Sequence, residues 1–411
     1  MKQKNWARCF GLLIAIVCLM MMYPAAVKAE QTVDTDSSAA QTGNTDNSAP
    51  QTGNADNSAP QTGNTDSSAA NGSADAGQEQ EIKYTIRRVS EKILMLPGET
   101  RMASTIIPST ATFSSSNTKL ALVSNRGQIV AKKPGTVKIT MTDGTVKTIY
   151  TVQIASEVDV IIFAGQSNMC GSGGNKQQAP TPKYGTAYEF DLDTGTQKCI
   201  LMKEPFGEGL NRANGLEGDS ASYSRRGTLT SAFCINYYKQ TKTPVVGIAA
   251  SWGGSSTNTW LSRGLVKQTQ RKLKIAKKQL KKQGIKIRHI YMVWLQGESD
   301  AKQERTQEAY ISAMRKIHAR MKKYGVEKTF MILIGQDAGH PERNGTIIAA
   351  QKKLCKKYND FILVSKKAPT FYNNYWQNYT DTVHLNQKCL NAIGYEAGKN
   401  AGKYAKKHTK K

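Results

Sequence analysis

Between residues 82 and 155, hydrophobic and polar positions along the chain follow a period of two. In the stretch TVKITMTDG (136–144), Val137, Ile139 and Met141 alternate with polar side chains, which is typical of a half-buried strand. Other short apolar runs between residues 82 and 155 are separated by the turn-forming sequences Asn-Arg-Gly, Pro-Gly and Asp-Gly. We therefore predict a small β-sandwich over residues 82–155.

From residue 156 onwards the pattern changes to apolar runs that alternate with helical periodicity. Nearly continuous apolar runs are typical of parallel strands buried on both faces; they occupy 158–163, 244–250, 287–295, 329–335 and 360–365. Between two of them, Tyr310, Met314 and Ile317 recur at helical spacing, and Gly325 follows as a stop signal. Residues 156–411 are thus predicted to form one α/β domain with a parallel sheet, its active site beyond the carboxyl ends of the strands.

The amino-terminal residues have the pattern of a secretory signal peptide. Basic residues are followed by an apolar run from Gly11 to Met22 and then by small residues up to Ala29. The run is shorter than the roughly 20 residues that span a bilayer. We expect residues 1–29 to be removed after Ala29, leaving a secreted, extracellular protein that can associate with the cell surface and has no transmembrane span.

A low-complexity segment follows, in which a ten-residue unit recurs as QTGNTDNSAP, QTGNADNSAP and QTGNTDSSAA. It offers almost no side chains to bury, so residues 30–81 are predicted to be a disordered linker.

The net charge of the folded region restricts the partners we expect. Residues 82–411 carry 53 basic and 22 acidic side chains. Such a field favours anionic polymers, which for an exported protein include those of the cell wall. No nucleic acid is expected, because no zinc-finger or RNP-type motif accompanies the lysines. The alternative that these lysines are simply solvated helix faces stays open.

Cysteine spacing points away from metal or disulfide chemistry. Five cysteines remain after the signal peptide, and no two of them form a C-x-x-C pair. We infer no disulfide framework and no structural zinc site, and expect neither a metal nor an organic cofactor.

Residues suited to acyl transfer lie at the ends of the predicted strands. Ser167, in GQSNM, directly follows the run 158–163, where a hydroxyl is exposed to the crevice as a nucleophile requires. Near the carboxyl terminus, Asp381 and His384 are three residues apart, so one turn can present both to the same cleft. His384 would then take the serine proton while Asp381 fixes the imidazole tautomer.

Two further strand-end segments, AASWGGSSTNTW and LQGESD, offer donors for an oxyanion. Gly254, with Gly253 beside it, and the amide of Gln296 suit that role, because backbone N–H groups and neutral amides add no competing base. The alternative is that both segments are ordinary tight turns that close strand–helix units.

The ordered blocks GQSNM, WGGSS, W-x-QGES and D-x-x-HLN resemble the sialate O-acetylesterase/acetylxylan esterase branch of the SGNH hydrolases. The resemblance implies a flavodoxin-like three-layer domain in which Ser167 is the nucleophile, His384 the general base and Asp381 its orienting carboxylate. It implies an oxyanion hole formed by the N–H groups of Ser167 and Gly254 with the Gln296 amide. The stretch from LPGE to KPGTVKITMT resembles group 2 bacterial immunoglobulin-like domains, which implies a spacer or adhesive role.

Taken together, these features predict a secreted carbohydrate O-acetylesterase that acts on acetylated glycans of the sialate or xylan type. One alternative is a catalytically weak glycan-binding or adhesive protein, and another is an esterase of lipid or other acyl esters. Gly253 and Trp376 are candidate substrate-binding residues. Trp376 belongs to an aromatic cluster just before Asp381, for which ordinary packing is the competing interpretation.

Overall fold

The structure, a computed structural model, describes residues 82–192, 196–209 and 225–409. The predicted signal peptide (1–29) and linker (30–81) lie outside the described residues. Across the described ranges, no helix combines the length and the apolar character needed to cross a membrane.

The amino-terminal β region contains two sheets that share one core. The first sheet has the order β1-β8-β7-β4, with β2 pairing to β8, and the second has the order β3-β6-β5. The core contains Ile129 from one sheet and Val137, Ile139 and Val152 from the other, all at most 2% exposed. The strands are β1 (Thr85–Arg88), β2 (Ile93–Met95), β3 (Thr100–Met102), β4 (Thr112–Ser115), β5 (Ala121–Val123), β6 (Gln128–Ala131), β7 (Gly135–Asp143) and β8 (Val146–Ile154).

The carboxyl-terminal region contains a seven-stranded sheet with the order β11-β10-β12-β9-β13-β14-β15. The five predicted strands are confirmed as β9 (Glu157–Gly165), β12 (Val245–Ala249), β13 (Lys286–Leu295), β14 (Lys328–Ile332) and β15 (Phe361–Ser365). They pair in parallel. Two further strands, β10 (Ala187–Asp191) and β11 (Lys198–Leu201), were not predicted from the sequence; β11 is an edge strand that runs antiparallel to β10.

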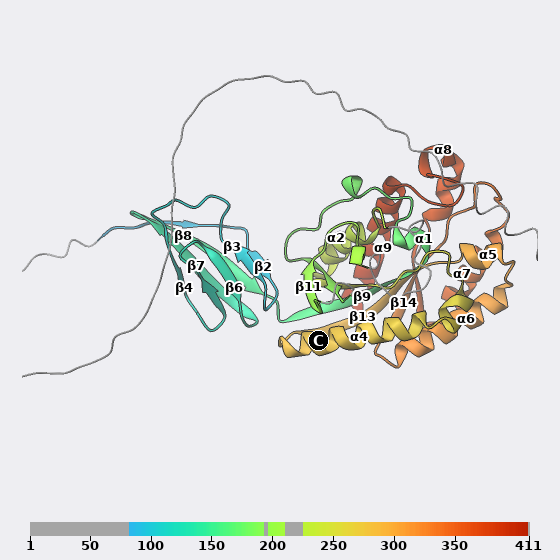
Figure 1. The fold of residues 1–411 in the computed structure, drawn as a ribbon, viewed down its shortest axis with the longest axis horizontal. Coiled ribbons are helices and arrows are strands. Elements are labelled where there is room, and N and C mark those ends of the chain that lie inside the picture. Colours follow the sequence, from blue (N-terminus) through green and yellow to red (C-terminus); the bar gives the residue numbers. More distant parts are fainter. Residues whose placement is uncertain (1–81, 193–195, 210–224, 410–411) are drawn as a thin grey trace, which may run out of the picture. The chain divides into compact units, whose positions relative to one another are not determined.

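Helices cover both faces of this sheet, which confirms the three-layer α/β architecture. Figure 1 shows α2 and α9 on one face and α4 and α6 on the other. The helices are α1 (Ser167–Cys170), α2 (Thr230–Thr241), α3 (Thr257–Ser262), α4 (Leu265–Lys282), α5 (Glu298–Lys302), α6 (Gln307–Lys322), α7 (Gly345–Lys357), α8 (Tyr375–Asn378) and α9 (Gln387–His408), with 3-10 turns at η1 (Lys176–Gln178) and η4 (Ala368–Asn374).

Helices α2 and α9 approach each other closely because α9 presents glycines every four residues. A Cβ at Gly394 would lie 2.4 Å from the Leu229 carbonyl oxygen, and one at Gly398 would lie 2.1 Å from that of Phe233. No larger side chain fits at these positions without moving backbone. This contact fixes the helix that follows the Asp381–His384 segment against the body of the domain.

Candidate active site

The candidate nucleophile lies at a sharp turn from strand to helix. Strand β9 ends at Gly165, whose φ is 152°, and Ser167 is the first residue of α1. A Cβ at Gly165 would lie 2.0 Å from the Leu295 carbonyl oxygen of β13, so the turn requires glycine. Ser167 is only 5% exposed, which puts it at the floor of the site rather than on its rim.

The Asp381–His384 segment is a tight loop closed by hydrogen bonds. Asp381 Oδ1 accepts from the backbone N–H groups of Val383 (2.8 Å) and His384 (2.7 Å), and His384 Nδ1 lies 2.6 Å from Asp381 Oδ2. Partial burial acts to raise the pKa of Asp381, but the His384 ring and the two backbone donors outweigh it and hold this pKa below its usual range. A charged Asp381 therefore leaves His384 Nε2 as the ring nitrogen that can accept a proton.

One cleft with a volume of about 720 Å³ brings three of the predicted residues together. Ser167, Gly254 and His384 all line it, although Ser167 and His384 share no direct hydrogen bond within the described ranges. Loose nucleophile–base geometry is common without substrate. The lining also includes polar side chains from the segments after β13 and β14, namely Lys302, Gln303, Asp337, His340 and Arg343.

Two backbone N–H groups are available to an oxyanion in this cleft. The Ser167 N–H has no intrahelical acceptor, because Ser167 begins α1. Gly254 is exposed in a turn with a φ of 64°. Neither N–H donates to another backbone group in the part of the chain that the structure describes. Gly253, by contrast, is buried and does not line the cleft, so the structure gives its predicted substrate contact no support.

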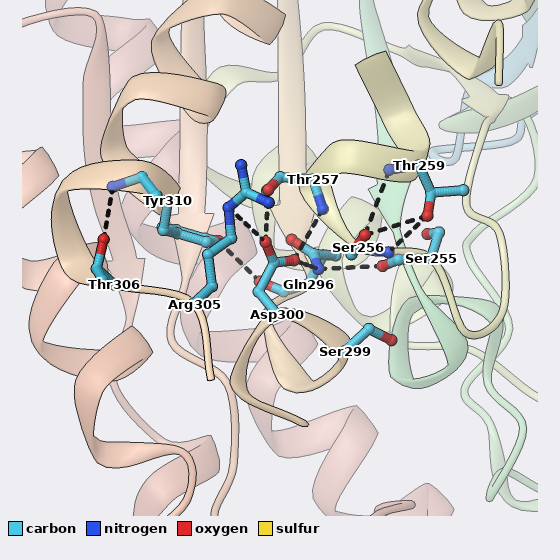
Figure 2. Close-up of polar contacts among 12 residues, drawn as sticks. Ser255, Ser256, Thr257, Thr259, Gln296, Ser299, Asp300, Arg305, Thr306 and Tyr310 are labelled. Atoms are coloured by element: carbon cyan, nitrogen blue, oxygen red, sulfur yellow. Dashed lines mark hydrogen bonds and ion pairs between the residues drawn. The ribbon is translucent and has the colours of Figure 1, made fainter. Parts of the chain in front are cut away.

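The side chain of Gln296 does not reach the cleft, where the sequence predicts it as an oxyanion donor. Its side chain is fully buried and does not line the cleft. Its amide nitrogen donates to Asp300 Oδ2 at 2.5 Å and to the Ser255 carbonyl at 3.0 Å (Figure 2). The buried carboxylate of Asp300 is a stronger acceptor than a neutral carbonyl. The predicted role of the Gln296 amide as an oxyanion donor therefore has no support in this geometry.

Asp300 ties the Gln296 segment to the Gly254 segment. Its carboxylate is fully buried and accepts from the Thr257 backbone N–H at 2.8 Å and from the Thr257 hydroxyl at 2.5 Å. Arg305 Nε lies 3.5 Å from Asp300 Oδ1, the oxygen that also accepts from the Thr257 hydroxyl (Figure 2). Thr257 begins α3, directly after the turn that carries Gly254, so Asp300 fixes that turn against the end of β13.

Gln166 joins the nucleophile turn to Gln296 and to the segment after β13. Its side-chain oxygen accepts from the Gln296 amide at 3.3 Å and from the Ser299 backbone N–H at 3.1 Å. The three segments after β9, β12 and β13 are thereby joined through Gln296, which acts as their common structural centre.

Asn168 is a functional candidate that the sequence analysis missed. Its side-chain nitrogen donates to Glu298 Oε1 at 2.8 Å and to the Val383 carbonyl at 3.0 Å, and its oxygen accepts from the Leu385 N–H at 3.0 Å. It therefore holds both backbone neighbours of His384 from the position next to Ser167. Its place beside the nucleophile in GQSNM was the one available signal.

Glu298 completes this link and is itself buried in the cleft wall. Burial raises the pKa of Glu298 above its usual range, against the opposing effects of the Asn168 hydrogen bond and the nearby His384. Its contact with Asn168 gives Glu298 a structural role in this link.

No group of three or more His, Cys, Asp or Glu side chains that could hold a metal ion occurs among the described residues. The five cysteines beyond residue 29 are free thiols.

The comparisons with known proteins agree with the two predicted modules. The family model described as "Carbohydrate esterase, sialic acid-specific acetylesterase" matches residues 157–401, and that of the group 2 bacterial Ig-like domain matches residues 96–152. No curated protein matches the chain.

Solved structures that resemble the chain do so at low identity. A protein from Arabidopsis thaliana is 18% identical, with a TM-score of 0.43 over 62% of this chain and 100% of that one. A carbohydrate acetylesterase from Xanthomonas citri is 14% identical, with a TM-score of 0.36 over 80% and 73%. An acetylxylan esterase from Geobacillus stearothermophilus is 10% identical, with a TM-score of 0.33 over 59% and 94%.

Proposed function

The chain belongs to the carbohydrate esterase family of sialic acid-specific acetylesterases, and from this premise we propose that it removes acetyl groups from glycans by a serine acyl-enzyme mechanism. One observation carries the proposal. His384, hydrogen-bonded to Asp381, lines the same cleft as Ser167, at the carboxyl ends of the parallel strands. A buried serine and an imidazole in one cleft, with a charged carboxylate bound to the imidazole, are the groups that acyl transfer needs.

In the first step, the Ser167 hydroxyl attacks the acetyl carbonyl while His384 Nε2 takes its proton. The oxyanion that forms accepts hydrogen bonds from the backbone N–H groups of Ser167 and Gly254. Collapse of the tetrahedral intermediate breaks the ester bond, and the sugar oxygen leaves with the proton from His384. Asp381 stabilises the imidazolium throughout.

In the second step, water attacks the acetyl-enzyme and His384 accepts one of its protons. The resulting intermediate releases acetate and returns the proton to the Ser167 oxygen. The mechanism needs no group beyond those in the cleft and water.

The lining of the cleft favours a short acyl group over a long one. Lys302, Gln303 and Arg343 on its wall offer hydrogen bonds to an acetylated sugar, whereas a lipid acyl chain requires a continuous apolar channel. This polar wall supports a carbohydrate ester as substrate, of the sialate or xylan type.

The experiment is acetate release from 9-O-acetylated sialic acid and from acetylated xylan, with the wild type, Ser167→Ala and Ser262→Ala. Ser262 is an exposed serine on α3 and serves as the matched control. We expect the wild type and Ser262→Ala to release acetate from at least one substrate, and Ser167→Ala to release none. A phosphonate ester should label Ser167, as read by mass spectrometry. Acetate release by Ser167→Ala at the wild-type rate would refute the mechanism.

We further propose that the enzyme is exported and acts on glycans outside the cell. The proposal rests on the signal-peptide pattern of residues 1–29. Exposed basic side chains on α4, such as Lys267, Lys274 and Lys278, support association with anionic cell-wall polymers. The mass of the protein recovered from culture medium and cell wall tests the export proposal, because cleavage after Ala29 predicts a mature chain that begins at Glu30.

A further inference from the structure

We propose that the aromatic segment Tyr372–Trp376 is a binding subsite for a second, neutral sugar ring, so that the enzyme acts on acetylated oligo- or polysaccharide chains rather than on single sugars. The identification of a saccharide chain as the substrate rests on the proposed esterase function. The binding of a neutral sugar ring at Trp376 does not depend on the esterase function and is tested separately.

The first observation is an exposed, rigidly supported aromatic face. Trp376 is 81% exposed, the highest value among the large hydrophobic side chains of the described residues. Its ring centroid lies 3.9 Å from that of Tyr375, which stacks in turn with Tyr372 at 6.1 Å. Tyr375 also packs against the main hydrophobic core. Because Tyr375 is anchored, Trp376 presents its indole to solvent from a fixed support.

The second observation is a direct connection between this face and the candidate catalytic loop. The Asn386 backbone N–H donates to the Asn378 carbonyl at 2.9 Å, and its side chain donates to the Gln377 carbonyl at 2.6 Å. Tyr379 and Leu385 form an antiparallel bridge that brackets Asp381 and His384. A sugar ring held by Trp376 is therefore held at a fixed position relative to His384.

The third observation is the chemistry of the segment. Residues 368–380 contain no charged side chain, in a chain with a net charge of +26. The side chains of Asn373, Asn374 and Gln377 are exposed around the aromatic rings. Amides both donate and accept hydrogen bonds, as sugar hydroxyls do. The faces of a pyranose ring carry C–H groups that pack on an aromatic ring.

This chemistry distinguishes a neutral glycan from other occupants. A polyanion would require cations in the segment, and a protein interface of useful affinity would require a larger apolar patch than a few rings. An aromatic face surrounded by amides matches the alternation of C–H faces and hydroxyls along a sugar chain.

The direct test is binding to full-length Ser167→Ala protein, which holds the substrate without turnover. Xylohexaose, chitohexaose and cellohexaose are titrated while tryptophan fluorescence is followed, in Ser167→Ala and in Ser167→Ala/Trp376→Ala. We expect at least one hexasaccharide to shift the fluorescence of the first protein, with affinity lowered about tenfold in the second. Tyr324→Ala is the matched control, because Tyr324 is also exposed but lies before β14, at the amino ends of the strands. Absence of saturable binding to all three hexasaccharides, or equal binding with and without Trp376, overturns the subsite.

The kinetic test compares partially acetylated xylo-oligosaccharides with a mono-acetylated methyl xyloside in the otherwise wild-type enzyme. Trp376→Ala should lower the ratio of kcat/KM for the oligosaccharide to that for the monosaccharide about tenfold, through KM, because a distant ring binds equally in ground and transition states. Trp376→Phe should lie in between. An unchanged ratio of the two kcat/KM values contradicts the proposal. A change in oligomeric state that leaves this ratio unchanged contradicts it as well. Failure of the wild type to release acetate from any substrate would instead count against the proposed function and leave the binding result to decide the subsite.

Discussion

The Asn168 side chain donates a 2.8 Å hydrogen bond to the carboxylate of Glu298 and thereby joins the nucleophile turn to the segment after β13. The same amide holds the Val383 carbonyl and the Leu385 N–H, on either side of His384. The distance from Ser167 to His384 is thus set by the residue next to the nucleophile. This arrangement makes Asn168 a positioning residue for the base.

Asn168→Asp should lower kcat on p-nitrophenyl acetate by on the order of 10²-fold, because the new carboxylate faces Glu298 and cannot donate to Val383. Glu298→Gln should have a smaller effect, since its remaining oxygen still accepts from Asn168. In the double variant the introduced glutamine amide donates to the introduced carboxylate, so part of the lost rate should return. Additive losses in this double-mutant cycle would contradict the positioning role.

Asp381→Asn should lower kcat by on the order of 10³–10⁴-fold with little change in unfolding midpoint. The asparagine oxygen can still accept from the Val383 and His384 N–H groups, but its NH₂ group then faces His384 Nδ1. The imidazole would be held in the wrong tautomer, with its proton on Nε2. Rates measured from about pH 5 to 9 check this, because the loss should persist at every pH.

The low pKa of Asp381 has a consequence for the wild-type pH profile. A carboxyl whose pKa is depressed stays charged as the pH falls through about 4, where a free aspartate titrates. Protonation of Asp381 should therefore not contribute to any fall of kcat above about pH 4. Titration of the Asp381 carboxyl followed by NMR checks this, and a midpoint above about pH 4 would contradict it.

Gln296→Met should lower both stability and kcat, because it removes the amide that joins three strand-end segments. We expect a loss of about 2–4 kcal/mol in the free energy of unfolding, since Asp300 loses a charge-assisted hydrogen bond while staying buried. Asp300→Asn should likewise lower both the free energy of unfolding and kcat. Asp143→Asn, at a surface site, should change neither of them. Urea unfolding and kcat on p-nitrophenyl acetate measure both effects.

A direct oxyanion donor would behave differently. Its removal costs on the order of 10²–10³-fold in kcat and leaves stability unchanged. If Gln296→Met loses kcat but keeps its stability, and Asp300→Asn is as stable as the wild type, the Gln296 amide would be assigned to the oxyanion hole after all.

Much of this architecture follows from local pattern. Five strands of the seven-stranded sheet were predictable because burial on both faces demands continuous apolar runs, and the position of Ser167 at the end of β9 follows from topology. Strand β11 was missed because it is short and only partly buried, so no period distinguishes it from a loop.

The orientation of Gln296 was not predictable in the same way. It depends on Asp300, four residues later, and on Ser255, forty-one residues earlier, which meet only in the folded protein. The contacts of Asn168 likewise span more than 200 residues to Val383 and Leu385. Sequence spacing identifies which side chains have suitable chemistry, whereas tertiary contacts decide which of them reach the cleft.

His318, on α6, makes the stability of the fold depend on pH. His318 is 2% exposed, with Nδ1 2.8 Å from the Thr329 hydroxyl. Burial lowers the pKa of His318 to about 4; Asp360 opposes this shift, and Lys322 and Lys328 add to it. The unfolded chain binds this proton near pH 6.5 and the folded chain only near pH 4, so between these values the unfolded state holds more protons. The free energy of unfolding should therefore fall as the pH drops from about 6.5 to 4, by up to about 3 kcal/mol from this residue.

His318→Gln can keep the contact with Thr329 but cannot titrate, so its stability should fall less steeply over that pH range. Asp360, whose own pKa is lowered, contributes a loss only below about pH 4 and does not obscure the comparison. His340→Gln, at an exposed position on the cleft wall, is the matched control and should keep the wild-type slope. Urea unfolding at pH 4, 5, 6 and 7 distinguishes the three proteins. Parallel curves for His318→Gln and the wild type would mean that His318 takes up its proton equally in the folded and unfolded states.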